Sequence, residues 1–97
     1  MMQNMQKILA IHSADNVGVA LITLTAGEEI NYLKATIIVM NDIPYGFKIA
    51  LKNIKKGQSV IKYGEVIGIS SQNIQRGEKV HVHNCESLRG RGDKIKL

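Results

Sequence analysis

The motif Ile74-Gln75-Arg76-Gly77-Glu78-Lys79-Val80 sets the architecture of this chain, because its form occurs three times. The other copies are Leu24-Thr25-Ala26-Gly27-Glu28-Glu29-Ile30 and Ile54-Lys55-Lys56-Gly57-Gln58-Ser59-Val60. Each has an apolar residue, two further residues, a glycine, a Glu or Gln, one more residue and a β-branched apolar residue. An apolar anchor, a tight turn whose last position needs a positive φ, and a new strand would produce this pattern. Three such corners in 97 residues predict a compact, folded-over all-β domain.

Seven segments between the turns are expected to be strands, because they are rich in β-branched residues or alternate apolar and polar residues. They are residues 6–12, 17–22, 33–40, 47–51, 59–62, 66–70 and 79–83. A helix over 45–56 is the competing interpretation, but its apolar residues make no regular helical stripe and it lacks capping residues. The segment 13–16, Ser-Ala-Asp-Asn, is expected to be a turn.

Composition indicates one globular domain, with an apolar content of 44% and a formal net charge of +5. Much of the positive charge comes from the last ten or so residues. We therefore expect a β domain over residues 1–87 and a basic C-terminal tail over 88–97. A nucleic-acid-binding surface would need a basic stripe with interleaved aromatic residues across the domain, so no nucleic-acid partner is expected.

The single cysteine, Cys85, cannot form an internal disulfide, which indicates a reducing compartment. With no partner to activate it, we expect this thiol to be inert. The sequence shows neither an apolar run long enough to cross a bilayer nor a signal peptide, so we expect a cytoplasmic protein without membrane contact. Exposed strand edges would allow copies of the chain to pair, so a homo-oligomer is a further alternative.

Two histidines follow the third copy of the motif. Because side chains two positions apart in a strand share a face, a strand over 79–83 would project His81 and His83 the same way, with Val80 and Val82 packed on the other side. Two imidazoles on one face can share a metal ion or hold a carboxylate, but a metal site usually needs three or more ligands. We expect the missing ligands to come from a partner chain; the alternative is a pair of solvent-facing histidines.

Other charged and polar side chains are candidates for binding. Lys48 and Lys62 could bind a substrate carboxylate, although strand-edge lysines are often simply solvated. Arg89 and Arg91 could hold a carboxylate bidentately or dock on a larger subunit, and a disordered basic tail is the alternative. His12 either joins the histidine cluster or simply ends the first strand.

Four segments follow one another along the chain: 15–21 (Asp-Asn-Val-Gly-Val-Ala-Leu), 43–51 (Ile-Pro-Tyr-Gly-Phe-Lys-Ile-Ala-Leu), 60–68 (Val-Ile-Lys-Tyr-Gly-Glu-Val-Ile-Gly) and 77–84 (Gly-Glu-Lys-Val-His-Val-His-Asn). Together they resemble the SAF (antifreeze-like) domain of the altronate and galactarate dehydratase superfamily. The resemblance runs from about Ile11 to Asn84, and linked motifs in the right order are more specific than any one of them. Residues 86–93 are similar to the tails of small subunits that stand apart from a large catalytic subunit; sulfolactate sulfo-lyase small subunits are of this type.

The resemblance implies a β-clip fold, in which short strands are folded double. It also implies β-elimination of water from a sugar acid to give a 2-keto-3-deoxy acid, with a general base and with a divalent metal ion, iron(II), shared with a partner subunit. Family members often have a histidine where this chain has Phe47, so this chain lacks whatever that histidine does. The candidate substrate-binding residues are Lys48, Lys62, Asn84, Arg89 and Arg91. The candidate metal ligands are His12, His81 and His83.

From the resemblance we expect the small subunit of an altronate/galactarate-type sugar-acid dehydratase, which contributes to metal or substrate binding and docks on a large catalytic subunit. The chain has too few acid–base groups for a complete active site, so no catalytic residue is assigned. Two alternatives stay open: a stand-alone module that binds a small acid, and the small subunit of a sulfolactate sulfo-lyase.

Overall fold

The computed structural model describes residues 6–88, which form nine short β-strands and no helical element. The strands are β1 (Ile8–Leu9), β2 (Val17–Ala20), β3 (Glu29–Tyr32), β4 (Ala35–Ile38), β5 (Lys48–Ala50), β6 (Ser59–Lys62), β7 (Glu65–Ser70), β8 (Lys79–Val80) and β9 (Cys85–Ser87). The prediction of an all-β fold with short, folded-over strands is confirmed. In this part of the chain no helix could cross a bilayer. The expected basic tail lies outside the described residues, apart from Leu88.

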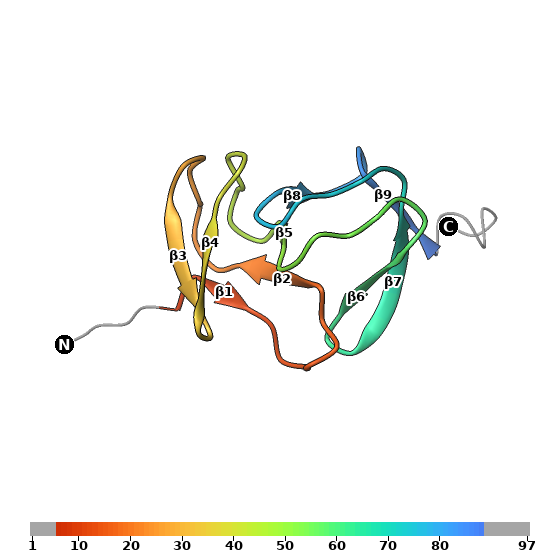
Figure 1. Ribbon diagram of the computed structural model, residues 1–97, viewed down its shortest axis with the longest axis horizontal. Coiled ribbons are helices and arrows are strands. Elements are labelled where there is room, and N and C mark those ends of the chain that lie inside the picture. The colour runs from red at the N-terminus through yellow and green to blue at the C-terminus, as the bar shows by residue number, and fades with distance from the viewer. Residues whose placement is uncertain (1–5, 89–97) are drawn as a thin grey trace.

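Three antiparallel sheets stand in a row (Figure 1). The central sheet has the strand order β1-β2-β5-β8, the hairpin β3-β4 lies at one end, and the sheet β6-β7-β9 lies at the other. In the central sheet Lys48 pairs with Val19 on one side and with Val80 on the other. Because Lys48 has a neighbouring strand on each side, its side chain is partly buried instead of lying at an open edge of the sheet.

Two hydrophobic cores lie against opposite faces of the central sheet. Successive residues of a strand point to opposite faces, so that in β5 Ile49 enters the first core and Ala50 enters the second. The first core contains Ile8, Ala20, Leu24, Ile30, Ile37, Val39, Ile43 and Ile49. The second contains Val17, Ala50, Ile54, Val60, Ile74 and Val80. Aliphatic residues fill both cores, as the small number of aromatic residues indicates.

Each copy of the repeated motif forms a corner with the same hydrogen bonds. The glycines of the three copies have positive φ, at 94° for Gly27, 90° for Gly57 and 93° for Gly77. In every copy the Glu or Gln side chain accepts a hydrogen bond from the backbone N–H that follows the apolar anchor. The bonds run from Thr25 to Glu28 at 2.9 Å, from Lys55 to Gln58 at 2.8 Å, and from Gln75 to Glu78 at 3.0 Å. The motif therefore needs a side-chain acceptor directly after its glycine.

A fourth corner, 43–49 (Ile-Pro-Tyr-Gly-Phe-Lys-Ile), has the same shape but different chemistry. Gly46 has a φ of 88°, and the N–H of Phe47 donates to the carbonyl of Pro44 at 3.0 Å. Because Pro44 has no N–H to satisfy, the position after the glycine does not need an acceptor, and Phe47 can occupy it. Isolated bridges join the corners in pairs, Leu24 with Ile43 and Ile54 with Ile74.

Two strands are missing from the set predicted from the sequence. β3 forms an antiparallel pair with β4, in which Ile30 faces Ile37. Ile30 is the only buried residue of β3. β9 pairs with β7 and buries none of its residues fully. Both strands are held by backbone pairing to a neighbour more than by their own apolar pattern, so a search for hydrophobic alternation passes over them.

Candidate functional site

The predicted strand over 79–83 is wrong beyond Val80, where β8 ends. A turn follows, in which the N–H groups of Asn84 and Cys85 donate to the carbonyl of His81 at 3.0 and 2.9 Å. Val82 is 80% exposed instead of packed against the sheet. The two histidines therefore do not share one face of a strand, and the geometric reason for pairing their imidazoles is lost.

The buried side chain of Asn84 explains why the strand stops. Its Oδ1 accepts the N–H of His81 at 2.9 Å, and its Nδ2 donates to the carbonyl of Lys79 at 2.9 Å. These bonds compete with sheet pairing, because they satisfy backbone groups that a ladder would otherwise use. The predicted contact of Asn84 with a substrate stays a prediction, and the side chain, which is 2% exposed, serves here as a brace for the turn.

His81 is half-buried beside Phe47. Their ring centroids lie 4.7 Å apart at an interplanar angle of 51°, and the Nζ of Lys79 lies 5.5 Å from the centroid of the Phe47 ring. Burial lowers the pKa of His81 below its ordinary value of 6.5, and the positive charges of Lys48, Lys79 and His83 lower it further. At neutral pH the ring is therefore uncharged and keeps a lone pair.

Lys48 lies in the middle of the same region and is also half-buried. Burial lowers the pKa of its ammonium group, as does the positive charge of Lys62, while Cys85 opposes the shift. Within residues 6–88 no carboxylate forms an ion pair with Lys48. The Nζ of Lys62 lies 5.2 Å from the centroid of the Tyr63 ring, a distance typical of a cation–π contact.

Burial raises the pKa of the Cys85 thiol, although the charge of Lys48 acts in the opposite direction. The thiol is therefore uncharged at neutral pH, in agreement with the expected inert role. We use the name cationic cluster for the three charged residues Lys48, Lys62 and Lys79 together with the uncharged ring of His81, on which the charges of Lys48 and Lys79 act. The three lysines form no ion pair with a carboxylate within residues 6–88, and several positive charges gathered in this way attract an anion.

The described residues do not fit a resident metal ion. No three His, Cys, Asp or Glu side chains within residues 6–88 are grouped closely enough to hold one. In particular, His12 does not form a triad with the other two histidines. Its Nδ1 accepts the N–H of Ala14 at 3.0 Å, and its ring lies against Gly64. Arg89 and Arg91 lie outside the described residues, so their predicted roles stay predictions.

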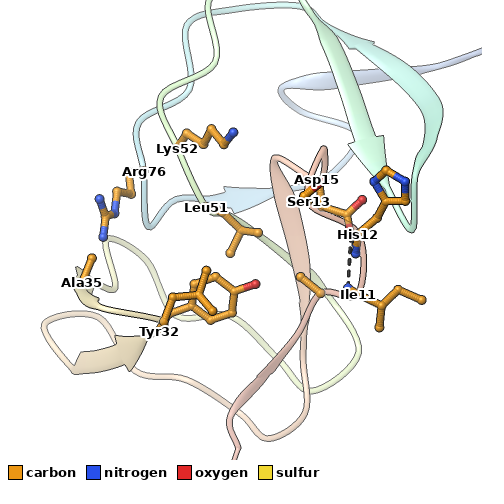
Figure 2. A pocket seen from close by; sticks show the side chains of 11 residues that line it. Ile11, His12, Ser13, Asp15, Tyr32, Ala35, Leu51, Lys52 and Arg76 are labelled. Atoms are coloured by element: carbon orange, nitrogen blue, oxygen red, sulfur yellow. Dashed lines mark hydrogen bonds between the residues drawn. The ribbon is translucent and has the colours of Figure 1, made fainter.

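A cleft of about 500 Å³ opens next to His12 (Figure 2). It is bounded by the β1–β2 connection, the β3–β4 hairpin, the residues after β5 and Arg76. Figure 2 shows Lys52 and Arg76 on one side of it and His12, Ser13 and Asp15 on the other, with Tyr32 between. No local pattern in the sequence indicates this cleft, because Tyr32, Lys52 and Arg76 come from distant segments that only the fold brings together.

Asp15 lines one wall of the cleft, and the residue as a whole is 3% exposed. Removal from water would raise the pKa of Asp15, but hydrogen bonds from the backbone N–H groups of Gly64, His12, Tyr63 and Ile11 lower it below its ordinary value. Burial raises the pKa of the Tyr32 hydroxyl, and the negative charge of Asp15 raises it further. Asp15 is therefore an ionised brace, and Tyr32 is a protonated hydrogen-bond donor.

The fold is a small folded-over all-β domain with a cationic cluster around Lys48 of its central sheet. The chain belongs to the altronate/galactarate dehydratase SAF domain family, whose model matches residues 6–88. The expected family is thus confirmed.

Two relatives are altronate dehydratases. The protein of Bacillus subtilis is 43% identical over 83 residues, which cover 86% of this chain and 17% of the relative. That of Escherichia coli is 43% identical over 79 residues, 81% of this chain and 16% of the relative. A (2R)-sulfolactate sulfo-lyase subunit alpha from Paracoccus pantotrophus is 50% identical over 48 residues, 50% of this chain and 72% of the relative. The chain therefore spans a small part of the altronate dehydratases that it matches.

Proposed function

We propose that this chain is the SAF part of an altronate/galactarate-type sugar-acid dehydratase and works with a larger catalytic part. In this role the cationic cluster receives the carboxylate of the sugar acid. The single observation that supports this most is Lys48, a half-buried ammonium group with a lowered pKa and no carboxylate partner within residues 6–88. Such a group is costly for the fold, and perturbed cations of this kind gather at functional sites.

In the elimination of water from a sugar acid, the cluster would assist catalysis as well as binding. In the elimination, a base removes the proton on the carbon beside the carboxylate, and the hydroxyl on the next carbon leaves. Negative charge grows on the carboxylate oxygens as the proton is removed. Fixed cations next to those oxygens stabilise this charge more in the transition state than in the ground state. We assign this role to Lys48 and Lys62, and leave the proton acceptor to the larger part.

The predicted iron(II) site is not used in this mechanism. His81 and His83 could supply at most two ligands, and a catalytic metal usually takes three or more from protein. An ion shared with a partner stays a prediction. Measuring bound iron in the chain alone and in its complex with the larger part tests it, and stoichiometric iron in the complex that is lost in His81→Ala would support it.

The relative from Paracoccus pantotrophus makes sulfolactate a second candidate substrate. This chain covers 72% of that subunit, far more than of either altronate dehydratase. A sulfo-lyase eliminates sulfite where a dehydratase eliminates water, and both leaving groups lie next to a carbon that must lose a proton. A cluster of several cations fits an acid that carries both a carboxylate and a sulfonate.

The test combines the purified chain with a large dehydratase-type catalytic protein. We expect no turnover by the chain alone and dehydration of altronate or galactarate by the mixture. Lys48→Met should raise KM for the sugar acid about tenfold or more, whereas Lys56→Met, an exposed lysine away from the cluster, should not. Sulfite release from sulfolactate would favour the second candidate. Turnover by the chain alone, or an unchanged KM in Lys48→Met, would refute the proposal.

A further inference from the structure

The polar groups of the cleft in Figure 2 are mostly unused donors. Lys52 forms no ion pair within residues 6–88. Arg76 donates from Nη2 to the carbonyl of Thr36 at 2.9 Å, while its Nε is withdrawn from water and has no partner in the described chain. The hydroxyl of Tyr32 also has no hydrogen bond within that range. Lys52 and Arg76 offer only N–H donors, and the hydroxyls of Tyr32 and Ser13 can also donate, so the site is suited to an anion.

The carboxylate in the cleft wall does not oppose this reading. The Oδ1 of Asp15 accepts the N–H of Gly64, and its Oδ2 accepts those of Ile11 and His12. Both oxygens therefore face backbone N–H groups, one in the turn between β6 and β7 and the other two in the β1–β2 connection. The negative charge of Asp15 is spread over these donors instead of being presented to an incoming anion.

The remaining walls of the cleft are apolar. Leu51 and Ala35 line it, and Ile11 and Leu33 stand at its rim with 68% and 85% of their surface exposed. Leu33 also has a φ of 58°, a left-handed conformation that is strained for a leucine. The strained turn holds the leucine side chain in water, and contact with an apolar ligand would be favourable because it removes this apolar surface from water.

We propose that this cleft binds a small monocarboxylate with a branched hydrocarbon body, at a site separate from the cationic cluster. The carboxylate meets Lys52 and Arg76, and the hydrocarbon covers Ile11, Leu33 and Leu51. A volume of about 500 Å³ is within the range of small-molecule sites. A sugar acid fits poorly here, because most of its hydroxyl groups would lose water against the apolar walls formed by Ile11, Leu33 and Leu51. The inference does not depend on the proposed function.

Titration of the ¹⁵N-labelled chain, followed by NMR, tests the site with three probes: 4-methylpentanoate, 4-methylpentan-1-ol and gluconate. We expect saturable shifts at the amides around the cleft with 4-methylpentanoate. The alcohol, which has the same body without the charge, should bind about tenfold more weakly. Gluconate should leave these amides unshifted. No saturation with the acid, equal affinity for acid and alcohol, or equal affinity for gluconate would overturn the proposal.

Three variants and one control assign the contacts. Lys52→Gln and Arg76→Gln should each weaken binding of the acid about tenfold and leave binding of the alcohol unchanged. Leu33→Asn should weaken both probes and should not unfold the domain, because asparagine tolerates a positive φ better than leucine. Lys56→Gln, which removes an exposed charge away from the cleft, should bind like the original chain. Original affinity in both charge variants would place the anion elsewhere and overturn the assignment.

Discussion

The Oδ1 of Asp15 accepts a hydrogen bond from the backbone N–H of Gly64 at 2.7 Å, and this bond joins the β1–β2 connection to the turn between β6 and β7. The other oxygen, Oδ2, accepts the N–H groups of Ile11 and His12 at 3.2 and 3.1 Å. One carboxylate therefore closes its own turn and holds a contact between two sheets. A charged acceptor makes such bonds stronger than a neutral one would.

Asp15→Asn is expected to lower the free energy of unfolding, because an amide has one acceptor oxygen and its NH₂ would face N–H groups. The pKa of Asp15 is lower in the folded than in the unfolded chain, so its stabilisation is present above the ordinary value of 3.8 and is lost as the pH falls below it. Urea denaturation near neutral pH and near pH ~3 measures both effects. The variant should differ from the original chain mainly at neutral pH.

Asp42→Asn is the matched control, because the exposed Asp42 accepts a single N–H, from Ala26, through Oδ1. An asparagine can make the same bond, so the urea midpoint should change little. If Asp15→Asn had no larger effect than Asp42→Asn at neutral pH, the role of Asp15 as the link between the two turns would be refuted.

Gly64→Ala is expected to destabilise the domain by about 2–3 kcal/mol, through two costs in one substitution. Gly64 has a φ of 80°, and a Cβ built on it would lie 2.8 Å from Cδ2 of His12. Gly57→Ala separates these costs, because Gly57 has a φ of 90° but open space where its Cβ would lie. That variant should lose only about 1 kcal/mol.

Thermal or urea denaturation of the two glycine variants and of the double variant His12→Ala/Gly64→Ala measures the difference. Removing the imidazole should restore the part of the loss that comes from the clash and leave the part that comes from φ. Equal losses in Gly57→Ala and Gly64→Ala would mean that the packing of His12 against the turn contributes nothing.

The sequence was sufficient for the fold class because the corner chemistry is local. A glycine at positive φ and a Glu or Gln that caps the turn lie within a few residues of each other, so Gly27, Gly57 and Gly77 could be recognised as equivalent. The fourth corner escaped recognition because Pro44 removes the N–H that needs a cap, and Phe47 then replaces the expected acceptor. Its equivalence is visible only in φ and in strand pairing.

The candidate site was less accessible to sequence reasoning. Alternation over Val80-His81-Val82-His83 has the period of a strand. The side chain of Asn84, however, forms hydrogen bonds with the backbone of this segment and stabilises a turn instead. The cleft depends on contacts between segments far apart in the chain, such as Tyr32 and Arg76. No local pattern could have indicated that these two side chains line one cavity.

Lys48→Met is expected to make the domain more stable, by about 0.5 kcal/mol, while it weakens binding of the sugar acid. Methionine keeps the hydrocarbon length of the side chain between Val19 and Val80 and removes a half-buried charge. Because the pKa of Lys48 is lowered in the folded chain, the original protein should gain stability as the pH rises toward 10.5, and the variant should lack this gain.

Urea denaturation of the chain and of Lys48→Met at neutral and alkaline pH checks this expectation, with Lys56→Met as the control for loss of an exposed charge. A Lys48→Met variant that is clearly less stable than the original chain would show that the ammonium group has a structural partner. In that case its unpaired charge could no longer support a binding role.

His81 provides the last prediction, because its titration reports the field of the cationic cluster. Its imidazole should titrate below 6.5 in an NMR experiment, since burial and the nearby positive charges disfavour the protonated ring. Lys48→Met and Lys79→Met should each move the pKa of His81 upward, because each removes a repelling charge, while Lys56→Met should leave it unchanged. His81→Gln identifies the resonance of the His81 ring.

A carboxylate bound in the cluster should also raise the pKa of His81. An upward shift of this pKa on adding sugar acid, absent in Lys48→Met, would place the ligand beside this ring. A pKa of His81 that is insensitive to both lysine substitutions would mean that these charges do not act together.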